Sequence, residues 1–171
     1  MANSRRRPRG PRGTRTPLLY SRTCQHALRA MERLAAAELE RPGGLQALAA
    51  LSREAGVPPA VLGQIVHRLR HAGLLDGRRG PSGGVRLSRE PGRIPVLEVV
   101  RVFDGDGVGG RCVLGFLECS DRTPCPAHPV WKIARAALER QLEARSLADL
   151  VGAVAKKRTA AARRLAGRRP V

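Results

Sequence analysis

Residues 45–88 constrain the fold of this chain more than any other stretch. Apolar residues at helical spacing predict one helix over 45–54 and a second over 59–71. Gly56 is placed to end the first helix as a C-cap, so a tight turn joins the two helices. Such a pair is a helix-turn-helix pattern, although an ordinary helical hairpin fits these residues equally well.

A turn-rich ribbon follows the second helix over residues 76–88. Four glycines shape a tight loop there, and Val85 and Leu87 alternate with polar residues as a short strand. Arg78 and Arg79 project from this loop beside no bulky neighbour, so a guanidinium could enter a narrow DNA minor groove. Two helices followed by such a ribbon favour a winged helix over the plain hairpin.

Three of the four cysteines fall in one short run, RCVLGFLECSDRTPCPAHPVW, at residues 111–131. Six residues separate Cys112 from Cys119, five separate Cys119 from Cys125, and His128 follows closely. Prolines within the run prevent a long helix, so the side chains can turn toward one centre. Three soft thiolates and an imidazole suit an iron–sulfur cluster or zinc.

Disulfides and reduced structural cysteines are the two alternatives for this run. Three clustered cysteines cannot all pair among themselves, and Cys24 lies far away on an expected helix. No secretory signal precedes the chain, which also argues against disulfides. Free cysteine is often a small buried hydrophobe, but three of them beside a histidine are hard to place as core packing. Metal or cluster binding is therefore favoured.

Strong positive charge predicts a polyanionic partner. The net charge is +18, with a pI near 11.7. Residues 1–17 hold six arginines and 154–171 hold seven basic residues, and neither segment has an acid. Both are predicted to be disordered basic tails, serving either as solvated ends or as arms that track nucleic acid. No apolar run approaches the roughly twenty residues of a membrane span, so a cytoplasmic protein is expected.

The remaining segments predict further helices. Periodic apolar residues mark a helix over 21–39, a helical segment over 94–104, and a helix after Pro129 with an apolar stripe. Ser146 and Asp149 have the spacing of a capping box that would start another short helical turn. With four aromatic residues in all, the core must consist mostly of Leu, Val and Ala. The fold expected is mainly α with a small β-wing.

From about residue 20 to 153, the chain resembles the IscR/NsrR family of bacterial winged-helix transcription regulators. The resemblance is carried, in order, by TCQHALRAM, QIVHRLRHAGLL, RRGPSGGVRLS, IPVLEVV and CVLGFLECSDRTPCPAHPVW. It implies a homodimer that binds a palindromic double-stranded DNA operator under the control of an iron–sulfur cluster. The implied parts are a winged helix-turn-helix DNA-binding domain over 18–104, a cluster-binding loop over 105–128, and a long dimerisation helix with a C-terminal turn over 129–153.

The resemblance also implies ligands for the cluster. Cys112, Cys119 and Cys125 match the three cluster cysteines of the family. His128 stands where IscR-like members complete a 2Fe-2S site, which is expected here more than 4Fe-4S. Other members use an acidic residue at the position of Gln25, and neighbouring Cys24 keeps a cysteine alternative open. Three cysteines and one histidine also suit tetrahedral zinc, in a DNA-binding or protein-interaction module that does not sense.

On DNA, the resemblance implies contacts from the start and exposed face of the second helix and from the wing. Gln64 is suited to read adenine, and Arg70 to hold phosphate. Gly63 departs from the family, where an acidic specificity residue can stand. No acid–base constellation or phosphate-binding glycine loop is present, which argues against an enzyme. The expected DNA contacts are Pro58, Ala60, Gln64, His67, Arg70, Arg78 and Arg79.

Overall fold

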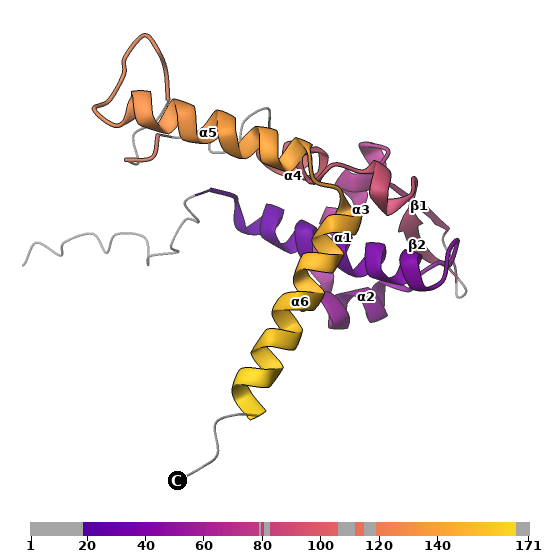
Figure 1. The fold of residues 1–171 in the computed structure, drawn as a ribbon. Coiled ribbons are helices and arrows are strands. Elements are labelled where there is room, and N and C mark those ends of the chain that lie inside the picture. The colour runs from indigo at the N-terminus through magenta and orange to yellow at the C-terminus, as the bar shows by residue number, and fades with distance from the viewer. Residues whose placement is uncertain (1–18, 79, 81–82, 106–111, 115–118, 167–171) are drawn as a thin grey trace, which may run out of the picture.

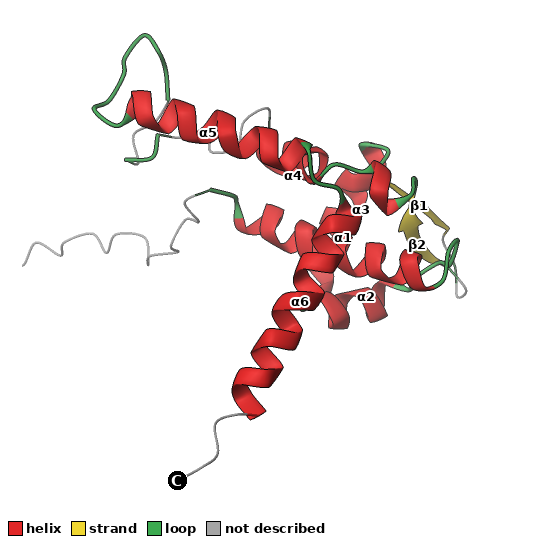
Figure 2. Ribbon diagram, viewed as in Figure 1, coloured by secondary structure: helices red, strands yellow, loops and turns green. Residues whose placement is uncertain are grey.

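The structure is a computed structural model that describes residues 19–78, 80, 83–105, 112–114 and 119–166. Within these residues the chain forms six α-helices, one short 3-10 helix and a two-stranded antiparallel sheet (Figure 1 and Figure 2). The fold class predicted from the sequence, mainly α with a small β-wing, is confirmed. None of the described helices is long and apolar enough to cross a membrane.

The elements follow one another with short connections up to α4. In chain order they are α1 (Arg22–Glu40), α2 (Leu48–Ala55), α3 (Pro59–His71), β1 (Leu75–Arg78), β2 (Gly84–Leu87), η1 (Pro91–Arg93), α4 (Val96–Asp104), α5 (His128–Glu143) and α6 (Leu147–Ala166).

The turn between α2 and α3 is fixed by its backbone and by one buried side chain. Gly56 ends α2 in the left-handed conformation, with φ of 61°, which glycine adopts without a steric penalty. The hydroxyl of Ser52 donates to the carbonyl of Val57 at 2.7 Å. Pro59 stands in the first turn of α3, where a missing N–H leaves no hydrogen bond unmade. The two helices of the helix-turn-helix therefore have a defined connection.

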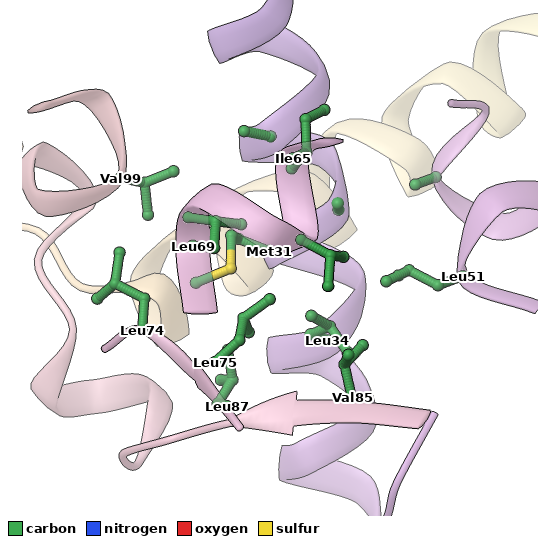
Figure 3. Close-up of a cluster of buried hydrophobic side chains, with 14 of the residues drawn as sticks. Met31, Leu34, Leu51, Ile65, Leu69, Leu74, Leu75, Val85, Leu87 and Val99 are labelled. Atoms are coloured by element: carbon green, nitrogen blue, oxygen red, sulfur yellow. The ribbon is translucent and has the colours of Figure 1, made fainter. Parts of the chain in front are cut away.

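The core lies where α1 crosses α3 and the sheet. Figure 3 shows Met31 and Leu34 of α1 among side chains of α3 and both strands. Burying one such aliphatic side chain contributes about 1.5–3 kcal/mol, so this cluster fixes α3 relative to the wing. Its members are mostly Leu, Val, Ile and Ala, as the composition predicts. Those labelled in the figure are Met31, Leu34, Leu51, Ile65, Leu69, Leu74, Leu75, Val85, Leu87 and Val99.

The wing is joined to the segment before α2. The two strands pair antiparallel, and β2 is bridged on its other edge by Gln46, whose N–H and C=O bond Val85 at 2.8 and 2.9 Å. This bridge requires a glycine at position 84, because a Cβ there would lie 2.5 Å from the carbonyl oxygen of Gln46. The ribbon predicted over 76–88 is confirmed in its strands. Arg79, in the wing loop, lies outside the described residues.

Helix α6 corrects one expectation. Residues 154–171 were predicted to be a disordered basic tail, but α6 continues as a helix to Ala166. Alanine, lysine and arginine are strong helix formers, and they dominate this segment. The capping box predicted at its start is confirmed, because Ser146 and Asp149 exchange hydrogen bonds of 2.9 and 3.2 Å. The backbone N–H of Ser146, and then its hydroxyl, donate to the Asp149 carboxylate and hold the pKa of Asp149 below its usual range. The predicted tail over 1–17 lies outside the described residues.

Candidate DNA-binding interface and candidate metal centre

Helix α3 turns one face to the core and the opposite face to solvent. Leu62, Ile65, Val66 and Leu69 are buried, as their spacing predicts. The resemblance assigns DNA contacts to positions of α3 and its N-cap. All of these positions are exposed in the structure. Gly63 lies on the same exposed face with open space around it. The exposed positions assigned to DNA are Pro58, Ala60, Gln64, His67 and Arg70.

An open groove separates the C-terminal half of α3 from the wing. Arg70 lines this groove and donates to the carbonyl of Gly77, another lining residue, at 3.4 Å. Asp76 is an acid in the lining, and the Arg86 guanidinium faces it at 3.9 Å. A surface with so many cations suits a phosphate chain, whose bound counterions are released on contact. The cationic or titratable lining side chains are His67, Arg70, His71, Arg78 and Arg86.

Arg68 has a different position from the other cations of α3. Its guanidinium donates to the carbonyl of Val102 and lies 4.5 Å from the centre of the Phe103 ring. Both partners belong to α4, so Arg68 connects α3 to α4 rather than facing the groove. A cation over an aromatic ring contributes about 0.5–1 kcal/mol at exposed sites. No signal in the sequence distinguishes Arg68 from its basic neighbours.

The cysteine segment brings its four expected ligands together as two pairs. The Sγ atoms of Cys112 and Cys125 lie 3.5 Å apart, and Cys119 Sγ lies 3.3 Å from Nδ1 of His128. The four cysteines all lie in the described residues, and none of them forms a disulfide bond. Cys112 is buried, whereas Cys119 and Cys125 are half-buried. The segment is therefore compact enough for each thiol to have another donor atom as a neighbour.

His128 is held by a carboxylate that sequence reasoning missed. It begins α5 and is buried, with Nε2 2.9 Å from Oδ1 of Asp121. Lys132, one turn further along α5, donates to the same carboxylate at 2.8 Å. The hydrogen bond from Lys132 is the largest cause that lowers the pKa of Asp121, and the hydrogen bond with His128 is the next. With an ionised acceptor at Nε2, that nitrogen carries the proton in the neutral ring, and the lone pair of Nδ1 faces Cys119.

These residues fit a soft metal centre in their chemistry. A carboxylate behind the far nitrogen of a histidine is the usual support of a metal-binding imidazole. Three thiols and one imidazole match the preferences of iron–sulfur clusters and zinc. Across the described part of the chain, however, no group of three or more His, Cys, Asp or Glu is arranged to hold a metal ion. The arrangement is two donor pairs, and residues 115–118 between Cys112 and Cys119 are not described.

The two alternative ligands lie at the start of α1. Cys24 is fully buried against Leu97 and Val100 of α4. Burial, and then the nearby Asp104 carboxylate, raise the pKa of Cys24 to about 12. Because a metal binds the thiolate, this site disfavours Cys24 as a ligand within its own chain. Gln25 directs its amide to the backbone carbonyl of Tyr20 at 3.5 Å.

Helix α5 projects from the body (Figure 1), and it carries both packed and exposed apolar residues. Leu138 and Leu142 pack against the cluster of Cys24, Leu97 and Val100. Val130 and Ile133, nearer its start, are 73% and 72% exposed. An exposed pair of large aliphatic side chains on a protruding helix is typical of a protein interface.

A helix-turn-helix with a wing and a basic groove between them is the architecture of DNA-binding transcription regulators. The family model of Rrf2, described as iron-dependent transcriptional regulator, matches residues 20–153. The chain therefore belongs to the Rrf2 family. The family and the relatives that match are described as transcriptional regulators, not as enzymes.

Relatives and solved structures agree with this assignment. IscR of Xenorhabdus nematophila, an HTH-type transcriptional regulator, is 36% identical over 104 residues, 61% of this chain and 63% of that protein, so the match spans under two thirds of its length. The structure of CymR, the global cysteine regulator of B. subtilis, matches with a TM-score of 0.62 at 26% identity, over 77% of this chain and 95% of that one. T. potens IscR matches with a TM-score of 0.59 at 26% identity, over 78% and 86%.

Proposed function

We propose that this protein is a dimeric transcription regulator whose operator binding is controlled by an iron–sulfur cluster. Cys112, Cys119, Cys125 and His128 would hold the cluster, and 2Fe-2S suits one histidine ligand better than 4Fe-4S. The observation that carries the proposal is the imidazole of His128, held by Asp121 on one side and facing Cys119 at 3.3 Å on the other. When bound, the cluster would supply a centre that responds to redox state, nitric oxide or iron supply.

Relatives support this reading of the donor set without deciding the signal. Relatives and a solved structure that match the chain carry the name IscR, and the family description is iron-dependent. CymR, a structural neighbour, is named for cysteine regulation, so the same fold is associated with more than one signal. The thiol and imidazole donors of this chain favour a signal that acts through a bound metal centre.

The DNA-reading part of the proposal rests on the exposed face of α3 and on the wing. Gln64, which is exposed, would read adenine by a bidentate contact in the major groove, a type of contact that contributes about 1–3 kcal/mol of discrimination. Arg70 and Arg78, which line the groove, and Arg79, which follows Arg78 in the sequence, would contact phosphate or the minor groove. Pro58, Ala60 and His67 would complete the contact surface. Phosphate contacts would set the register, and the α3 contacts the sequence.

Dimerisation is proposed for the exposed side of α5. Val130 and Ile133 would be buried against the same residues of a second copy, since a two-fold axis pairs like with like. The two α3 helices would then read half-sites about 34 Å apart on one side of the duplex. A change in the angle between subunits would take both helices out of register at once.

A series of contacts leads from the cysteine segment to α3. His128 starts α5, and Leu138 and Leu142 of α5 pack against α4. An ion pair of 3.4 Å between Arg101 and Glu143 also joins α4 to α5. Arg68 of α3 then holds the C-terminal end of α4. A shift of the start of α5 could be passed to α3 along these contacts, which is the proposed route of control.

The test compares protein with and without its cluster. The full chain is purified without oxygen, its iron and sulfide are measured, and duplexes are selected from random DNA by both forms. We expect an iron–sulfur absorption band that is lost when Cys112 and Cys119 are replaced by alanine and kept in Cys24→Ala. We also expect the two forms to differ in affinity or in footprint. A wild-type protein without the band, or forms that bind alike, would contradict cluster control.

Zinc is the second candidate for the same donors. Three thiolates and one imidazole complete a tetrahedral zinc site, and the two donor pairs are compatible with either metal. A zinc module would stabilise the segment without sensing. Elemental analysis of the purified chain separates the candidates, because zinc without iron, together with unfolding on chelation, would favour the zinc module.

A further inference from the structure

We propose that the outer face of α6 binds the phosphate backbone of the DNA that flanks the operator. We call this surface the basic α6 face, and it consists of Lys156, Lys157, Arg163 and Arg164. The inference rests on the proposed function, since it takes double-stranded DNA as the partner. It adds a contact surface that belongs neither to the helix-turn-helix nor to the wing.

The helix places these four cations on one side. Lys156 and Arg163 are seven residues apart, as are Lys157 and Arg164, so each pair lies on nearly the same side of the helix about 10 Å apart. All four are exposed. A helix of this kind presents its charges as a row of fixed spacing, which a flexible tail cannot do.

The opposite side of α6 attaches the helix to the body. Leu147 is fully buried, and Leu150 and Val151 pack against the main core. Further along, Arg158 reaches Glu32 of α1 at 3.5 Å, and that carboxylate is buried and also bound by Arg33 at 2.7 Å. Because Arg158 points toward α1, the basic α6 face points away from it. The last turns of α6 extend past the rest of the molecule (Figure 1).

The charge of this face is not neutralised within the chain. Among the described residues of α6 from 150 onward, Arg158 takes part in an ion pair and the other cations do not. No acidic residue follows Asp149 in the sequence. Placing these cations on DNA would release condensed counterions, which strengthens binding as salt is lowered.

DNA fits this surface better than an acidic protein does. The row contains cations and alanine but no large apolar or aromatic side chain, whereas protein interfaces are centred on such anchors and are depleted in lysine. A nucleic-acid backbone needs only charge and reach. The groove beside α3 already gives the molecule a second cationic surface, so a duplex passing both would be held at two places.

The test separates the flank from the operator. A duplex selected by the wild-type chain is prepared bare and with about 15 base pairs of flank on each side, one and a half helical turns. Binding is measured by fluorescence anisotropy over a range of salt concentrations. The test variant carries Lys156→Ala, Lys157→Ala, Arg163→Ala and Arg164→Ala. The matched control exchanges lysine and arginine at the same four positions and keeps the charge.

On the flanked duplex we expect the test variant to bind more weakly, with a slope of log affinity against log salt that is shallower by about 0.9 for each lost contact. The control should match the wild type, and sequence preference should not change. Equal binding of test variant and wild type to the flanked duplex would overturn the proposal, as would an equal loss on the bare duplex. A wild-type chain that selects no DNA sequence would instead contradict the proposed function.

Discussion

Both ring nitrogens of His128 have a polar partner, and the two partners differ in charge. Nε2 faces a carboxylate whose pKa is lowered by Lys132 and by the histidine itself, so it faces a charged acceptor. Nδ1 faces a thiol at 3.3 Å. The carboxylate thus selects the tautomer with a free lone pair at Nδ1. In the proposed cluster site, Asp121 would thus prepare His128 to act as a ligand.

Replacing Asp121 by asparagine should weaken cluster retention. The amide can direct its NH₂ group at Nε2, which would favour the tautomer that places the proton on Nδ1. Loss of such a support typically lowers metal affinity about 10- to 100-fold. The measurement is the rate at which the visible absorption of the purified cluster decays with a chelator present, and Asp121→Asn should decay faster than wild type.

Lys132→Ala is the matched control, because it removes the other partner of Asp121 and leaves the contact with His128 in place. We expect it to decay at close to the wild-type rate. Circular dichroism of both variants checks that α5 is intact. If Asp121→Asn kept its cluster as long as wild type, Asp121 would have no positioning role.

The proximity of the cysteines and His128 could be predicted from their spacing, but the contact between Asp121 and His128 could not. Spacing shows which soft donors lie close together along the chain. It does not show which way an imidazole turns, since that depends on the bend at 120–127 and on the start of α5. The same holds for Arg68, whose neighbours in the sequence are also basic. Its contacts with α4 depend on how α4 packs on α3, and the sequence does not show that packing.

Glycines of α3 and of the wing strand have opposite requirements. In α3, Gly63 has open space around it, so a methyl group would meet nothing within 4 Å. In β2, Gly84 lies against the backbone of Gln46, where a methyl group would clash at 2.5 Å with an atom that cannot turn away. The fold thus requires glycine at position 84, whereas at position 63 it leaves room for a larger side chain.

We therefore expect Gly84→Ala and Gly63→Ala to change stability in opposite directions. Gly84→Ala should destabilise the protein by about 1–3 kcal/mol, the usual range for overpacking, because β2 must move away from Gln46. Gly63→Ala should stabilise it by about 0.5–1 kcal/mol, since alanine loses less backbone entropy in a helix. Urea unfolding followed by circular dichroism measures both. A neutral Gly84→Ala would mean that the bridge between Gln46 and β2 is not maintained in solution.

Most helices could be predicted from periodicity, because the apolar residues of α1 and α3 recur at helical spacing and are buried, and those of α5 recur at the same spacing although part of them is exposed. The extent of α6 could not. Beyond Val154 it has no stripe to bury, and a segment of alanine and cations reads equally well as a disordered tail. Its helical form depends on intrinsic propensity and on the ion pair between Arg158 and buried Glu32, a contact between residues far apart in sequence.

In the molecule as a whole, the start of α5 carries the most exposed of the large apolar side chains that the structure describes. Leu138 and Leu142 attach the later part of this helix to the body, while Val130 and Ile133 are 73% and 72% exposed. The proposed dimer would bury that pair against its own copy and would set the distance between the two recognition helices. The subunit fold itself does not depend on these residues, because the core lies elsewhere.

Ile133→Asp should therefore separate the subunits without unfolding them. A charge at a buried two-fold contact would face its own copy, and both carboxylates would lose water, so association should become unfavourable. Sedimentation velocity should show a dimer for wild type and a monomer for the variant, with similar helix content by circular dichroism. Ala155→Asp, on the exposed part of α6, is the control for the added charge and should remain a dimer. The monomer should also lose cooperative binding to a palindromic duplex, because each subunit would hold its half-site alone. A variant that stays dimeric would place the interface on another surface, and the exposed start of α5 would need a different partner.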